Sequence, residues 1–149
     1  MASIAPDNPS QALTQARAIW AALCMGLIFT SVALYSTMPS TEPPSAILAE
    51  WPLSAIAWVL LLTVIPLGLF VRGQVFKRGW EGDAVTPAAY LKGNIIAWAC
   101  CEGTAFVGLI LGFMDHRAGS QFSAAVIAFA TLVALWPNGR AMWPLGVRE

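Results

Sequence analysis

Four long stretches of apolar residues divide the chain, and short segments rich in proline, glycine or charged residues separate them. Backbone N–H and C=O groups cannot stay unpaired in lipid, so each stretch is expected to form an α-helix rather than a strand. About 20 apolar residues are enough for a helix to cross roughly 30 Å of hydrocarbon. We therefore predict membrane helices over about residues 16–36, 51–72, 91–114 and 120–136.

The predicted fold class is an all-α integral membrane bundle of four transmembrane helices in a single domain, residues 1–149. The composition agrees, because 58% of the residues are hydrophobic and only 11% are charged, whereas a soluble domain carries roughly 25% charged residues. The fourth helix is the shortest, and it needs modest bilayer thinning or anchoring by Trp136 and Trp143 to span. Residues 17–26 align weakly with residues 94–103, which leaves open that two related helical hairpins make up the bundle.

The basic residues predict how the bundle is oriented. Arg17 precedes the first predicted helix, and the segment between the second and third is strongly basic. The positive-inside rule then places both termini and this central segment in the cytoplasm. Residues 36–50, which contain no Lys or Arg, are expected outside. Asn8 and Pro9 are a suitable N-cap and first residue for the first helix.

Glu102 is the one charged residue in the apolar stretch 94–114, and it lies near its centre. A carboxylate at mid-bilayer costs at least about 2.5 kcal/mol, so such a residue is a candidate functional site. On a helical wheel, small residues form one stripe, at which other helices can approach closely. Its members are Ala97, Cys101, Ala105, Gly108 and Gly112, with Thr104. Bulky residues, among them Trp98 and Leu109, form the next stripe. Glu102 falls within the bulky stripe, so the closest contact inside the bundle need not be where the carboxyl points.

Two interpretations of Glu102 stay open from the residues alone. In the first, it is an ion-binding carboxyl that faces lipid, a groove or a partner subunit. In the second, it is protonated and structural, and it forms a hydrogen bond with a neighbouring helix. The candidate residues for packing or polar support of Glu102 are Thr104, Thr63 and Ser31, besides Thr131 and a carbonyl near Pro66.

No other pattern points to a specific chemistry. The three cysteines, Cys24, Cys100 and Cys101, lie in apolar stretches without metal-ligand spacing, so we expect packing roles and no metal site. His116 lies in a short polar turn and is expected to be solvated. We predict no catalytic residues, no cofactor and no enzymatic activity. The net charge of zero gives no reason to expect nucleic-acid binding.

Residues 87–112 resemble the carboxylate-bearing helix of rotary ATPase proteolipids (subunit c, or subunit K of the vacuolar type). The resemblance rests on a polar loop before the helix, on Glu102 followed by small residues, and on the ending Phe106-Val-Gly-Leu-Ile. It implies that Glu102 is a proton- or sodium-binding carboxylate. The second predicted helix departs from that family, because it has bulky residues and Pro66 in place of a glycine ladder. The whole chain resembles small bacterial four-helix membrane proteins with such a third helix.

The leading hypothesis for function is a non-enzymatic integral protein of the bacterial inner membrane. We expect an accessory or assembly subunit of a larger membrane complex, in contact with the lipid bilayer and with partner subunits or further copies of itself. The alternative is a proteolipid-like subunit that translocates protons or cations through Glu102. A module that binds lipid or a hydrophobic small molecule in a cavity between helices is a third possibility.

Overall fold

The computed structural model describes residues 8–37, 53–114 and 120–143, and it is helical apart from a small hairpin. The predicted outer segment lies almost entirely outside these residues, and so does His116. The elements in chain order are α1 (Pro9–Thr37), α2 (Leu53–Arg78), β1 (Trp80–Glu81), β2 (Ala84–Val85), α3 (Pro87–Met114), α4 (Ser120–Ala134) and a short 3-10 helix, η1 (Arg140–Met142).

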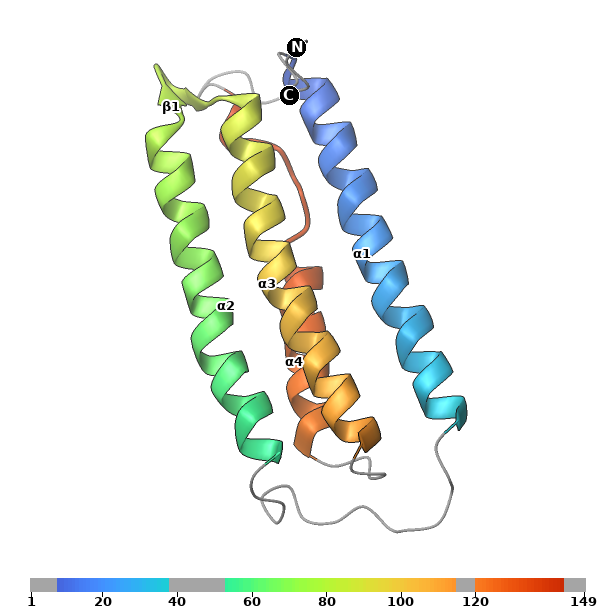
Figure 1. Ribbon diagram of the computed structural model, residues 1–149. Coiled ribbons are helices and arrows are strands. Elements are labelled where there is room, and N and C mark those ends of the chain that lie inside the picture. Colours follow the sequence, from blue (N-terminus) through green and yellow to red (C-terminus); the bar gives the residue numbers. More distant parts are fainter. Residues whose placement is uncertain (1–7, 38–52, 115–119, 144–149) are drawn as a thin grey trace, which may run out of the picture.

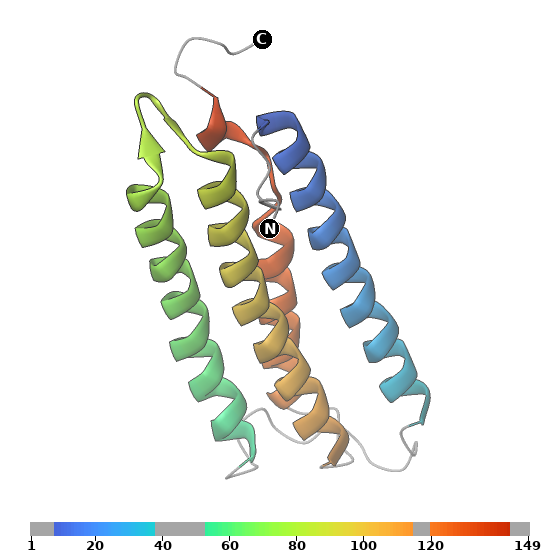
Figure 2. The same cartoon turned by 45° about the horizontal axis from the view of Figure 1, so that its top comes forward.

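Helix α3 lies at the centre of the bundle. Figure 1 shows it between α1 and α2, with α4 behind it, and it packs against all three. The start of α1, the β1–β2 hairpin and η1 lie at one end of the bundle, which the tilted view of Figure 2 shows most clearly. The all-α fold class is confirmed for the described residues, with the two-stranded hairpin as an unpredicted addition.

Three helices, α1, α2 and α3, are long and apolar enough to cross a membrane. Helix α4 has 15 residues, so its length of about 22 Å is less than the roughly 30 Å of a hydrocarbon core. It ends at Ala134, two residues before the predicted end. Pro137 follows soon after, and proline cannot donate the hydrogen bond that a continuing helix needs.

The other helices are longer than predicted, because local polar groups extend them beyond their apolar stretches. Helix α1 begins at Pro9 instead of residue 16. Asn8 caps it as predicted: its side-chain oxygen accepts a hydrogen bond from the Ser10 N–H at 3.0 Å, and its carbonyl accepts one from the Ala12 N–H. Helix α2 continues six residues past the predicted end to Arg78, so the first part of the predicted loop is helical.

A tight hairpin closes the connection between α2 and α3. Strands β1 and β2 pair antiparallel across the residues Gly82 and Asp83, and Gly82 has a φ of 59°, which glycine adopts without strain. The Thr86 N–H donates to the Gly79 carbonyl at 2.8 Å, and this bond ties the two helix ends together. The short connection fixes α2 and α3 as antiparallel neighbours.

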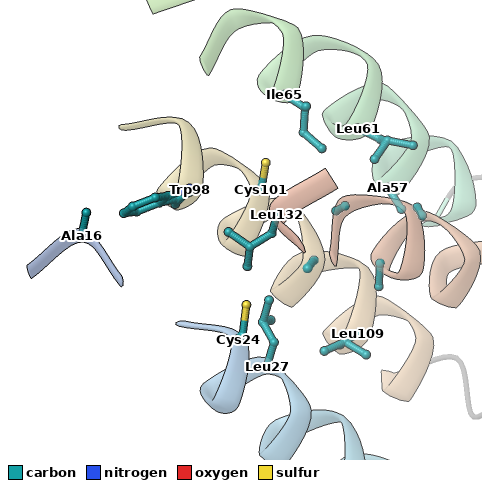
Figure 3. Packing of buried hydrophobic residues seen from close by; sticks show 14 of the residues in the cluster. Ala16, Cys24, Leu27, Ala57, Leu61, Ile65, Trp98, Cys101, Leu109 and Leu132 are labelled. Atoms are coloured by element: carbon teal, nitrogen blue, oxygen red, sulfur yellow. The ribbon is translucent and has the colours of Figure 1, made fainter. Parts of the chain in front are cut away.

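The small-residue stripe of α3 is buried, as the helical wheel predicted. Ala97, Cys101 and Ala105 are each 1% exposed, and Thr104 is 4% exposed. Small side chains allow helix backbones to approach closely where lipid gives no hydrophobic drive. The bulky stripe is divided, however: Trp98 and Leu109 join the buried cluster, and Figure 3 shows Trp98 extending from α3 toward Ala16 of α1.

Candidate functional site

Glu102 lies on α3 at the edge of its buried face, beside α1. Its side chain is partly buried, whereas the neighbouring Cys101 is fully buried and Gly103 is exposed. Across the helix interface, the Cys24 thiol of α1 lies within electrostatic reach of the Glu102 carboxyl. The carboxyl is therefore at the α1–α3 boundary, neither inside the core nor on the open surface.

The structure joins Glu102 to none of the supporting groups that the sequence suggested. Each of those hydroxyls donates to a carbonyl four residues earlier in its own helix: Ser31 to Leu27, Thr63 to Val59, Thr104 to Cys100 and Thr131 to Ile127. Within the described ranges, no hydrogen bond or ion pair links Glu102 to another side chain or to a backbone group. No described residue therefore uses its capacity for hydrogen bonding.

A second stripe of small residues lies on α1, the helix beside Glu102, and it is largely exposed. Ala18, Ala22, Gly26 and Thr30 recur every four residues along α1, which places them on one side of the helix. Ala18 and Ala22 are exposed, and Gly26 and Thr30 are half-buried. A Cβ placed on Gly26 would meet nothing within 4 Å. Gly103 instead lines a pocket with Leu60 and Val64 of α2. We call the four α1 residues, with Glu102, the outer α1–α3 face.

An apolar cavity lies one to two helical turns farther along α1 and α3. Its volume is about 270 Å³, and α1, α3 and α4 line it with Leu27, Ser31, Ala105, Leu109 and Phe129 among others. Ser31 is its polar lining residue, and that hydroxyl is engaged by the Leu27 carbonyl at 2.7 Å. Nothing in the lining is therefore ready to orient a polar ligand.

The end of α4 is held by two tryptophans, one on α1 and one on α3. The Trp20 indole N–H of α1 donates to the Leu132 carbonyl at 2.9 Å, and the Trp98 indole N–H of α3 donates to the Leu135 carbonyl at 3.1 Å. The last carbonyls of a helix lack the N–H donor four residues farther on. The Leu132 carbonyl also accepts from the Leu135 N–H at 3.2 Å, and the two indoles complete the hydrogen bonding at the end of α4.

The irregular segment after α4, Leu135–Gly139, is fixed at its far end by Tyr90. The Gly139 N–H donates to the buried Tyr90 hydroxyl at 3.0 Å, and Gly139 has a φ of 73°. The Trp136 ring meets Trp20 edge-on at 4.7 Å. Sequence analysis missed this arrangement, although the residues Trp-Pro-Asn-Gly after an unusually short apolar stretch signalled a helix break.

The described part of the chain holds no group of three or more His, Cys, Asp or Glu side chains that could bind a metal ion. Cys24, Cys100 and Cys101 are free thiols. Glu102 is thus the one acidic group among the apolar side chains of the described helices, and its chemistry is that of a single carboxyl. It can donate one hydrogen bond when protonated, or bind one cation when ionised.

Comparisons of the chain with protein-family models, with curated protein sequences and with solved structures give no match. The resemblance of α3 to a proteolipid helix therefore stays a prediction from the sequence.

Proposed function

We propose that this protein is a non-enzymatic accessory or assembly subunit of a complex in a bacterial inner membrane. The observation that carries the proposal is Glu102, a carboxyl without a partner in the described bundle, beside an exposed stripe of small residues on α1. Small residues let a second helix approach closely, and a polar group on that helix would satisfy the carboxyl. The partner is a transmembrane helix of another subunit or of a second copy.

The proposed topology has four crossings with both termini in the cytoplasm. Helix α4 covers about 22 Å, and the five residues Leu135–Gly139 add at most about 17 Å of backbone, so together they are long enough for the fourth crossing. Their carbonyls at membrane depth are bonded by Trp20 and Trp98, which supports a non-helical end to this crossing. The basic residues on the hairpin end of the bundle support a cytoplasmic location for that end.

A pair of matched substitutions tests the proposed partner face. Gly26→Leu would fill the small-residue stripe, and Gly73→Leu would add the same side chain on α2, where a Cβ also meets nothing within 4 Å. Both variants should fold. In mild detergent, we expect the wild type and Gly73→Leu to run as a complex larger than the monomer, and Gly26→Leu to lose it. A wild-type protein that is a monodisperse monomer without bound protein would contradict the proposal.

The second candidate function is proton or cation translocation through Glu102. It is favoured by the absence of a hydrogen-bond donor or cation beside this carboxyl in the described residues, because such a group is free to exchange a proton. Dicyclohexylcarbodiimide, which attacks protonated carboxyls in apolar surroundings, should then modify Glu102 selectively. Glu102→Gln should abolish proton flux into liposomes while the bundle stays folded, and unchanged flux would end this interpretation.

A further inference from the structure

Arg72 lies on α2 at the end of its apolar stretch, six residues before the helix ends at Arg78. Six residues of helix correspond to about 9 Å, so Arg72 is at the depth where hydrocarbon gives way to headgroups if the helix spans the bilayer. A long basic side chain at this depth usually extends toward water. Arg72 does not do so freely, because its side chain is half-buried.

The side chain of Arg72 is held by α3 and by its own helix. Its guanidinium carbon lies 4.9 Å from the centre of the Phe76 ring, and Phe76 in turn stacks on Tyr90 with ring centres 5.7 Å apart. The stem passes Gly93 of α3, where an added Cβ would lie 3.5 Å from the Arg72 Cγ and 2.6 Å from Phe76. Tyr90 is itself fixed by the Gly139 N–H. These contacts with α2 and α3 fix the position of the guanidinium.

The guanidinium lacks the partners that a buried arginine usually has. Its Nε–H is buried and has no hydrogen-bond acceptor. No carboxylate within the described ranges forms an ion pair with it. A buried donor without an acceptor carries its full desolvation cost, and this cost is largest for a charged group. The terminal nitrogens of Arg72 are not among the buried atoms and form no hydrogen bond in the described structure, so they are open to an anion.

The hairpin end of the bundle carries more exposed basic residues than acidic ones. Lys92 is exposed and adjoins Gly93 in the chain, and Lys77 and Arg78 are exposed at the end of α2. The two acidic residues of the hairpin, Glu81 and Asp83, are exposed, and neither forms an ion pair with Arg72 in the described structure. An anion that approaches along the membrane surface meets a net positive region.

We propose that Arg72 is the centre of a binding site for the phosphate of an anionic phospholipid, between the hairpin ends of α2 and α3. A guanidinium presents a planar fork of donors that matches two phosphate oxygens, and arginine is the preferred residue for this contact. The depth of Arg72 favours a lipid phosphate over free phosphate, because a headgroup is already located there while its acyl chains lie along the exposed apolar side of α2. This site is separate from the outer α1–α3 face.

Native mass spectrometry of the full chain in mild detergent tests the site. The protein is titrated with phosphatidylglycerol, with zwitterionic phosphatidylcholine, and with inorganic phosphate. We expect one phosphatidylglycerol to be retained and to raise the unfolding temperature. Arg72→Gln should bind it at least about tenfold more weakly, because it loses charge-assisted hydrogen bonds. Arg72→Lys should be intermediate, since it keeps the charge but loses the fork.

Arg78→Gln is the matched control, because it removes one positive charge from the exposed end of the same helix. It should bind phosphatidylglycerol within about twofold of the wild type. The unfolding temperature of each variant without lipid shows that it is folded before its binding is compared. Equal retention by Arg72→Gln and the wild type would overturn the proposal. Displacement of the lipid by millimolar inorganic phosphate would overturn the lipid assignment, and so would equal binding of phosphatidylcholine.

Discussion

Helices α1 and α3 are almost equal in length and alike in their apolar composition, but the bundle holds them very differently. Of the 28 residues of α3, 11 are buried, whereas only four of the 29 residues of α1 are buried. Helix α3 packs against three other helices, and α1 packs mainly against α3. The small residues of α3 face inward, and the stripe Ala18, Ala22, Gly26 and Thr30 of α1 faces outward. Composition alone does not tell which small-residue stripe a bundle uses and which it leaves for a partner.

The largest difference between the packed surface of α3 and the open stripe of α1 should appear when a leucine is added against each. Gly68→Leu on α2 would place its Cβ 2.7 Å from the Cys100 Cβ of α3, so α2 and α3 must separate. We expect it to lower the free energy of unfolding by about 3 kcal/mol. Gly26→Leu on α1 should change it by less than about 0.5 kcal/mol, because the added side chain meets open space. Unfolding in mixed detergent micelles measures both.

An equal loss of stability in Gly68→Leu and Gly26→Leu would contradict the contrast between a packed and an open face. Gly73→Leu controls for the change in helix propensity, because it is exposed on α2 with nothing near its Cβ.

The next effect concerns the indoles that hold the end of α4. Trp98→Phe keeps most of the buried ring but removes the N–H that bonds the Leu135 carbonyl. We expect a loss of about 1–2 kcal/mol, because the carbonyl is left without a partner in apolar surroundings. Trp58→Phe is the matched control, since the Trp58 N–H is buried and has no acceptor. Thermal unfolding should show no loss for Trp58→Phe, and an equal loss in both variants would mean that ring packing, not the bond, matters.

The smallest effect is predicted for Glu102. Because the described bundle gives this carboxyl no hydrogen bond, Glu102→Leu should change the unfolding free energy of the isolated protein by less than about 0.5 kcal/mol. If the carboxyl were a structural link between helices, the same change would cost about 0.6–2 kcal/mol. Unfolding of the purified monomer measures this difference. Glu102→Gln retains a hydrogen-bond donor but cannot ionise. It therefore distinguishes the loss of a hydrogen bond from the loss of the carboxylic acid.

The sequence was a good guide to features that depend on one helix at a time. The apolar stretches predicted all four helices, and the spacing of Ala97, Cys101 and Ala105 predicted the buried side of α3. The cap at Asn8 was predicted too, because an N-cap needs only neighbouring residues. In each case the deciding interaction is local, or it depends on which side of a helix a residue occupies.

The features that the sequence did not reveal depend on contacts between distant residues. The Trp20 and Leu132 bond joins positions 112 apart, and the Tyr90 and Gly139 bond joins positions 49 apart. No periodicity encodes such pairs. The hairpin was missed because each of its strands has only two residues. The ion-binding role of Glu102 stays a prediction, since its location at an edge is compatible with either function proposed for it.

Site-specific photocrosslinking in native membranes is the most direct test of the central claim, that the outer α1–α3 face binds a transmembrane partner. A photoreactive residue at Ala22 lies on this face and is exposed, and one at Leu62 of α2, which is 69% exposed, probes a different helix surface. We predict a discrete adduct of one added protein mass from Ala22, abolished by Gly26→Leu, and lipid adducts only from Leu62. Lipid adducts alone at both positions, or the same protein adduct from both, would contradict the account.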